Sequence, residues 1–290
     1  MRTGNVSANG VRFAYVESGP HDGALALCLH GFPDSPRTWR YLLDDLASAG
    51  FRAVAPFMRA YAPTEVPSDG NVQAGALVAD ANGLHDALGG REDAVIIGHD
   101  WGAIAAYGAS AHSPQRWRRV VGLAVPPLPH LMQSFLAYDQ IRASWYMFFF
   151  QHPLAEAVVQ NDDLSFVDRL WAAWSPGYDG AADAKAAKKA LRGQAHLAGV
   201  LGYYRALLDP SSHSERFSAE QAAAMSAPAR PTLYLHGSDD RCILPQTAEG
   251  SELALPAESS MSTVEGAGHF LHLERPDTVN GRILDFLSTS

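Results

Sequence analysis

Short apolar runs alternate with segments of helical spacing over the first 125 residues, and the pattern returns near the end of the chain. The predicted strands are Val11–Glu17, Ala24–Leu29, Phe51–Pro56, Ala94–Ile97, Val120–Val125 and Pro231–Gly237. Helical spacing with a glycine stop marks Trp39–Gly50 and Ala74–Leu88 between them. The order predicts an α/β fold with a mostly parallel sheet covered by helices on both faces. Val11–Glu17 alternates in the manner of an edge strand.

The alternation lapses in the middle of the chain. Residues 127–214 have helical patterns, many aromatic residues and no clear strand. We therefore predict a helical cap inserted into one α/β domain, with residues 1–126 and 215–290 as the two parts of the core. Within the cap, Ala181–Arg192 is predicted to be a helix with a solvated, charged face.

Composition narrows the class of protein. The 290 residues are 47% hydrophobic, enough for one large core, and the net charge of -9 argues against nucleic acid or an anionic membrane as partner. The apolar cluster Trp145–Phe150 is far shorter than the roughly 20 residues of a membrane span. Met1–Val6 lacks the apolar core of a signal peptide. These features predict a soluble, cytoplasmic protein, with monomer and homodimer both open.

The two cysteines, Cys28 and Cys242, are too few for a disulfide framework and lack the spacing of a zinc site. Cys28 lies within an apolar run and is predicted to be a small core residue. The sequence therefore predicts no metal.

The segment Gly98–Gly102, which reads Gly-His-Asp-Trp-Gly, places a carboxylate where a serine is usual. It joins the predicted strand Ala94–Ile97 to a helix start, and small flanking residues permit the strained turn called a nucleophile elbow. Attack by a carboxylate on an ester carbonyl would give an anhydride, whereas attack on a saturated carbon gives an ester that water can cleave. Asp100 thus indicates an sp³ electrophile, such as an epoxide or an alkyl halide.

A base and an acid are expected later in the chain, in the order nucleophile, acid, histidine. Asp239 and Asp240 follow the last predicted strand, and His269 follows a further short segment. Loops at the carboxyl ends of strands are where such sheets build their sites. His99 and His236 are predicted to be core or supporting groups.

Four motifs in one order resemble the epoxide hydrolase branch of the α/β-hydrolase superfamily, to which haloalkane and fluoroacetate dehalogenases are related. They are His30-Gly31-Phe32-Pro33, the segment Gly98–Gly102, Gly237-x-x-Asp240 and Gly268-His269. The resemblance spans essentially the whole chain. It implies that Asp100 is the nucleophile, His269 the base and Asp240 its partner, with no metal or organic cofactor required.

Two backbone N–H groups are expected to form the oxyanion hole. Trp101 follows the nucleophile and supplies one, and the resemblance implies that Phe32 supplies the other. His30, in the same turn, is predicted to be structural.

An epoxide oxygen needs a proton donor, which tyrosine can supply. The resemblance implies two cap tyrosines, Tyr146 in a segment ending Phe-Gln-x-Pro and Tyr204 in a Tyr-Arg pair. Tyr203 and Tyr138 are the fallback choices, and simple packing is the alternative role for all of them. The predicted substrate is a small apolar epoxide, because the pocket residues are aromatic: Phe32, Trp101, Trp145 and Phe149.

Other functions remain open at this stage. Haloalkane dehalogenases commonly have asparagine at the position of Phe32, and fluoroacetate dehalogenases have arginine at the position of Trp101, so both residues favour the epoxide. A carboxylesterase or lactonase is disfavoured by the carboxylate nucleophile. A non-catalytic binding protein on the same scaffold is the more distant alternative.

Overall fold

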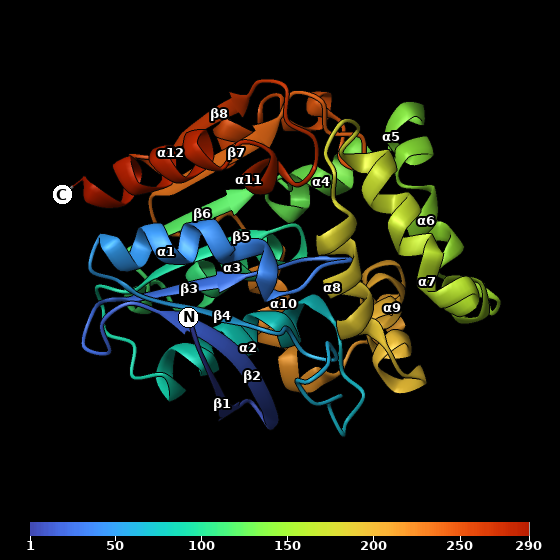
Figure 1. Cartoon of the computed structure of the whole chain (residues 1–290), viewed down its shortest axis with the longest axis horizontal. Helices are drawn as coiled ribbons and strands as arrows, with labels where there is room; N and C mark the ends of the chain where they lie inside the picture. Colours follow the sequence, from blue (N-terminus) through green and yellow to red (C-terminus); the bar gives the residue numbers. More distant parts are fainter. Residues whose placement is uncertain (290) are drawn as a thin grey trace.

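Eight strands form one sheet in the computed structural model of the chain, which describes residues 1–289 (Figure 1). The order across the sheet is β1-β2-β4-β3-β5-β6-β7-β8, and the strands from β3 to β8 run parallel. The strands are β1 (Arg2–Ala8), β2 (Val11–Ser18), β3 (Leu25–Leu29), β4 (Arg52–Pro56), β5 (Val95–His99), β6 (Arg119–Leu123), β7 (Thr232–Gly237) and β8 (Ser260–Val264). The predicted mostly parallel sheet is confirmed.

The two edges of the sheet differ from the prediction. β2 is not an edge strand, because β1 pairs with it antiparallel and Asn5 lies opposite Ala14. The opposite edge is β8, which was also not predicted as a strand. Both edge strands are largely polar and partly exposed, so an apolar run could not mark them.

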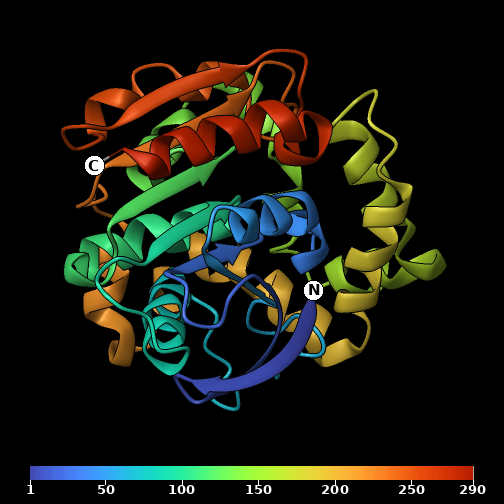
Figure 2. The ribbon, with the colours of Figure 1, turned by 60° about the vertical axis from the view of Figure 1, so that its left-hand side comes forward.

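Helices cover both faces of the sheet (Figure 2). On one face α2 (Ala74–Ala87), α3 (Trp101–His112) and α10 (Ser218–Ala224) pack on one another. On the other face α12 (Pro276–Ser288) packs on α1 (Arg40–Ser48) and α11 (Leu271–Glu274). Buried parallel strands with helices on each side explain why all residues of β3 to β7 are buried.

Six further helices lie between β6 and β7 and gather beside the sheet, on the right of Figure 1. They are α4 (Leu128–Ser134), α5 (Tyr138–Ala143), α6 (Trp145–Phe149), α7 (Ala155–Trp174, broken at 161–164), α8 (Ala181–Leu191) and α9 (Gln194–Leu208). We propose that residues 127–214 form the cap, and that residues 1–126 and 215–290 form the core. The packing of α10 on α2 and α3 supports the second boundary.

The charged face of α8 is only partly solvated, which corrects the prediction. Asp183 is buried, and its carboxylate accepts hydrogen bonds from Arg37, Arg40 and the Tyr178 hydroxyl. The two arginines come from the core, so their hydrogen bonds to Asp183 join the proposed cap to the core. A pairing over 140 residues of chain leaves no local signal in the sequence.

Short 3₁₀ helices connect the remaining segments. They are Pro36–Trp39, Pro114–Arg116, Pro210–Ser212, Glu215–Phe217, Pro245–Ala248 and Ser251–Ala254. No helix in the described part of the chain is both long and apolar enough to cross a membrane.

Candidate active site

Asp100 stands in a sharp turn between β5 and α3, as the elbow motif predicted. Its backbone has φ 53° and ψ -120°, a conformation that costs a non-glycine residue about 1–3 kcal/mol. The flanking glycines make room for the turn. A Cβ atom on Gly98 would lie 2.0 Å from the carbonyl oxygen of Gly102, and one on Gly102 would lie 2.0 Å from that of Leu29. Only glycine fits either position.

The two oxygens of the Asp100 carboxylate have different surroundings. Oδ1 accepts a hydrogen bond of 2.7 Å from the backbone N–H of Phe32, in the turn after β3. Oδ2 lies 3.7 Å from Nε2 of His269. Trp101, whose N–H is the other predicted oxyanion donor, is the first residue of α3. The carboxylate is therefore held by one oxygen and faces a histidine with the other.

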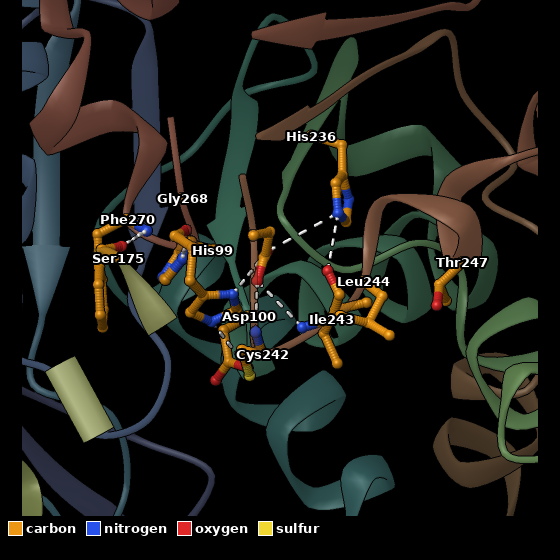
Figure 3. A network of polar contacts seen from close by, with 12 residues as sticks. His99, Asp100, Ser175, His236, Cys242, Ile243, Leu244, Thr247, Gly268 and Phe270 are labelled. Carbon is orange, nitrogen blue, oxygen red and sulfur yellow. Dashed lines mark hydrogen bonds and ion pairs between the residues drawn. The ribbon is translucent and has the colours of Figure 1, made fainter. Parts of the chain in front are cut away.

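His269 follows β8 in the chain and faces Asp240, which follows β7. Its Nδ1 lies 2.9 Å from Oδ2 of Asp240. The other carboxylate oxygen, Oδ1, accepts the backbone N–H groups of Cys242 at 2.7 Å and Ile243 at 3.0 Å. Figure 3 shows the Cys242 and Ile243 side of this network beside Asp100. Asp239, the competing acid, is exposed and makes no contact with His269.

The charges in this cluster support one another. Burial acts to lower the pKa of His269, but the neighbouring Asp240 and Asp100 carboxylates raise it well above its usual value. Burial also raises the pKa of Cys242 to about 11, so the thiol is neutral near pH 7 and the two carboxylates carry the effect. Burial acts to raise the pKa of Asp100, and the hydrogen bond and charge of His269 outweigh it and lower that pKa. The free site thus holds an imidazolium between two carboxylates.

Two tyrosine hydroxyls of the cap lie buried near this cluster. Tyr146 comes from α6 and Tyr204 from α9, and their ring centroids are 5.5 Å apart. The Tyr146 hydroxyl contacts Sγ of Cys242 at 3.4 Å, whereas the buried Tyr204 hydroxyl has no hydrogen-bond partner among residues 1–289. Burial raises the pKa of both phenols well above 10, so both keep their protons as donors at neutral pH.

The fallback tyrosines are placed elsewhere. Tyr203 donates its hydroxyl to the backbone carbonyl of Arg59 at 2.7 Å, and Tyr138 is 76% exposed. Neither presents a free hydroxyl to Asp100.

Aromatic rings enclose the two tyrosines. The ring of Tyr204 contacts Phe32 at a centroid distance of 5.3 Å, Trp101 at 5.2 Å and Phe150 at 5.2 Å. Trp174 packs on Tyr146 at 4.9 Å. The predicted pocket residues Phe32 and Trp101 are therefore brought together, and they are joined by Trp174 and by Phe150, which was not predicted as a pocket residue.

Trp145 is a correction to the predicted pocket. It is 49% exposed, and it packs on Phe149 and Phe166 rather than beside Asp100. Phe149 is half-buried in the same outer cluster. Residues four apart share a helix face, so Tyr146 implies Phe150, while Trp145 and Phe149 share the neighbouring face. This spacing was readable in the sequence.

Other histidines lie close to the cluster as supporting groups. His99 is buried, and its Nε2 donates to the backbone carbonyl of His269 at 2.9 Å. His236 is buried and contacts the backbone carbonyl of Ile243 through Nε2 at 3.0 Å. In the turn after β3, His30 Nε2 accepts the backbone N–H of Met58. These placements agree with the structural roles predicted for them.

The buried side chains of Asp34, His99 and His272 form a second polar cluster, called here the buried polar group behind His99. Asp34, His99 and His272 each offer one atom that could bind a metal ion, and these atoms lie within 4.8 Å of one another. Oδ2 of Asp34 and Nδ1 of both histidines have no hydrogen-bond partner among residues 1–289. Burial raises the pKa of Asp34 to about 8 and lowers that of His99 to about 3, so neutral forms are favoured at all these positions.

A family model described as "alpha/beta hydrolase fold" matches residues 27–276, most of the chain. The chain belongs to this family. Among α/β-hydrolase relatives, the AB hydrolase superfamily protein YfhM of Bacillus subtilis is 29% identical, over 97% of this chain and 96% of its own length. A protein named epoxide hydrolase from Caballeronia sordidicola is 29% identical, over 98% of this chain and 93% of its own length.

Solved structures of α/β-hydrolases are also similar. The crystal structure of the Bacillus megaterium epoxide hydrolase in complex with an inhibitor is 25% identical, with a TM-score of 0.81. The match covers 99% of this chain and all of that one. Fold and likeness thus extend over both the core and the proposed cap.

Proposed function

We propose that this α/β-hydrolase opens a small apolar epoxide to a vicinal diol through an ester on Asp100. The observation that carries the proposal is an elbow carboxylate with Phe32 N–H on one oxygen and His269 facing the other. Two buried phenols of the cap, Tyr146 and Tyr204, supply donors for the epoxide oxygen. Relatives named epoxide hydrolase over nearly their full length add support.

In the first step Oδ2 of Asp100 attacks a ring carbon of the epoxide, because Oδ1 is held by the Phe32 N–H. The carbon–oxygen bond of the ring breaks as the ester bond forms. A phenol, Tyr146 or Tyr204, donates its proton to the departing oxygen, and the His269 imidazolium restores that proton. The product is a hydroxyalkyl ester beside a neutral imidazole.

Ester formation itself prepares His269 for the second step. It removes a negative charge 3.7 Å from Nε2, and at an effective dielectric constant near 20 such a contact is worth about 4 kcal/mol. The pKa of His269 therefore falls when the ester forms, which favours the base form only then. Asp240 keeps the Nδ1 proton in place throughout.

In the second step neutral His269 takes a proton from water, and the resulting hydroxide adds to Cγ of Asp100. Negative charge develops on Oδ1, where the N–H groups of Phe32 and Trp101 stabilise it. The bond between Cγ and the alkyl oxygen breaks, the proton of the added hydroxyl passes to that departing oxygen, and the diol leaves with it. The carboxylate and the imidazolium are restored.

Substrate must pass the cap to reach Asp100, because the carboxylate is 8% exposed and His269 is fully buried.

A single turnover in ¹⁸O-water tests the covalent route. With enzyme in excess over an aryl epoxide such as styrene oxide, the first diol should contain only unlabelled oxygen, and Asp100 should gain the label. Label in the first diol would overturn the proposal. Haloalkanes and fluoroacetate, assayed beside the epoxide, separate it from dehalogenation, and Asp100→Asn supplies the inactive control.

The cytoplasmic location remains a prediction of the sequence alone, and monomer and homodimer both stay open.

A further inference from the structure

One buried amide of the cap hydrogen-bonds both the cap and the core. Gln140 lies in α5 and is 2% exposed. Its Nε2 donates to Oγ of Ser144 at 2.8 Å and to the backbone carbonyl of Cys242 at 3.0 Å. Its Oε1 accepts the backbone N–H of Leu244 and the hydroxyl of Thr247, both at 2.9 Å. Both donors and both lone pairs of the amide are thus in use.

The orientation of this amide is fixed by its partners. The Cys242 carbonyl can only accept and the Leu244 N–H can only donate, so exchanging Oε1 and Nε2 would oppose like groups at both contacts. A buried amide satisfied at all four positions is a specific contact rather than a chance one.

The core partners of Gln140 belong to the loop that holds the proposed catalytic acid. The backbone N–H groups of Cys242 and Ile243 bind Oδ1 of Asp240. Gln140 binds the Cys242 carbonyl, which belongs to the same peptide group as the Ile243 N–H, and the Leu244 N–H in the next peptide group. Figure 3 shows Leu244 and Thr247 extending from the same loop. A shift of this loop would therefore move Asp240.

The cap partner of Gln140 leads to the proposed proton donor. Ser144 is the residue directly before α6, whose second residue is Tyr146. Tyr146 in turn contacts Sγ of Cys242, the residue whose carbonyl Gln140 binds. The amide closes a ring of contacts that joins the phenol to the acid loop.

We propose that Gln140 is a positioning residue that holds Tyr146 of the cap in register with the Asp240–His269 pair of the core. The inference rests on the proposed function, because it assigns the two ends of the ring their chemical roles. It explains why a polar side chain of the cap is buried at this boundary. Beside it lies a cavity of about 760 Å³ that Gln140, Asp240 and Thr247 help to line.

Gln140→Glu tests the inference with almost no change in shape. Protonated, the new carboxyl donates to the Cys242 carbonyl and still accepts from Leu244. Ionised, it has no proton to donate and repels that carbonyl. Because the position is buried, the new carboxyl is expected to titrate above its usual range.

We therefore expect the kcat of Gln140→Glu, divided by that of the wild type at each pH, to fall as pH rises. Displacement of a catalytic group costs on the order of 10-fold to 100-fold, and KM for styrene oxide should change little. Taking the ratio removes the ionisations of Asp240, Cys242 and His269 that both proteins share. Gln246→Glu is the matched control, since Gln246 lines the same cavity but is exposed, and its ratio should stay flat.

A ratio that stays constant for a folded Gln140→Glu would show that Gln140 is merely structural and would overturn the inference. If that variant does not fold, Thr247→Val takes its place, because it removes one donor to the amide oxygen. Its kcat should fall about 2-fold to 10-fold, as expected for one hydrogen bond, with KM unchanged, and an unchanged kcat would overturn the inference.

A readout without substrate separates this inference from the proposed function. The Nδ1 proton that His269 shares with Asp240 should give a low-field proton NMR signal in the wild type. In Gln140→Leu that signal should weaken by exchange with water, and an unaltered signal would count against positioning even if no epoxide were turned over. Wild-type protein that turns over no epoxide contradicts the proposed function alone.

Discussion

Asp34 provides the most quantitative test of the buried polar group behind His99. Its side chain is buried; Oδ1 accepts the backbone N–H of Ser35 at 2.7 Å, and Oδ2 has no partner among residues 1–289. Burial raises the pKa of Asp34 to about 8. In the unfolded chain an aspartate titrates near 3.9, so the folded protein holds a proton that the unfolded chain releases.

This difference makes the protein less stable as pH rises. The contribution of Asp34 is fully favourable below the unfolded pKa and is lost as pH rises toward about 8. At 1.36 kcal/mol per pKa unit, Asp34 lowers the free energy of unfolding by about 4 kcal/mol at pH 7, relative to acidic pH below the unfolded pKa. Near pH 5 the decrease is less than half of that.

Asp34→Asn should remove this loss, because an amide is neutral at every pH. Its oxygen can still accept from Ser35, and its two N–H groups offer donors to the unpaired Nδ1 atoms of His99 and His272. We expect the variant to be more stable than the wild type near pH 7, by up to about 4 kcal/mol, with a smaller difference near pH 5.

Urea unfolding followed by tryptophan fluorescence measures the two free energies of unfolding. The series runs from about pH 5 to about pH 8 in the presence of EDTA, so that bound metal does not contribute. Asp139→Asn, at a side chain that is 71% exposed, is the matched control and should follow the wild type. A difference between Asp34→Asn and wild type that is constant over this range would refute the reasoning.

Three further predictions concern the reaction. His269→Gln should accumulate the Asp100 ester, seen as an intact-protein mass increase equal to one epoxide; a turned-over substrate that leaves no adduct contradicts the base assignment. In stopped-flow experiments ester formation should stay nearly constant from about pH 6 to about pH 9 while ester hydrolysis slows toward acid, since His269 must be neutral only in the second step; parallel pH profiles would count against this order. Tyr146→Phe and Tyr204→Phe should each slow ring opening by on the order of 10²-fold, whereas Tyr138→Phe should not; equal rates in all three would remove the phenols from the mechanism.

The sequence was sufficient for the parts of the fold that are buried on both faces. Strands such as Arg52–Pro56 are short apolar runs because helices cover both sides of the sheet, and that environment leaves a local pattern. The edge strands Arg2–Ala8 and Ser260–Val264 are strands because a neighbouring strand pairs with them, and their polar composition did not indicate a strand.

The same distinction, between residues marked by a local sequence pattern and residues defined by distant partners, applies to the candidate site. Motifs in chain order predicted Asp100, Asp240 and His269, and the fold brings these three together. The contacts that Gln140 and Asp183 make with the core could not be predicted, because those core partners lie more than 100 residues away in the chain. Phe150 was within reach of helical spacing, since it lies four residues after Tyr146.

The single hydrogen bond from Phe32 to Oδ1 of Asp100 has a consequence for the history of each oxygen atom. An anchored Oδ1 stays in the enzyme from one cycle to the next, while the opposite position is emptied by each departing diol and refilled from water. In labelled water the second diol should already carry solvent oxygen in full. If the carboxylate rotated freely between turnovers, the label would instead appear gradually, and the unlabelled fraction of the diol would halve with each turnover. The oxygen atom that enters the carboxylate from water in one turnover therefore leaves with the diol of the next turnover.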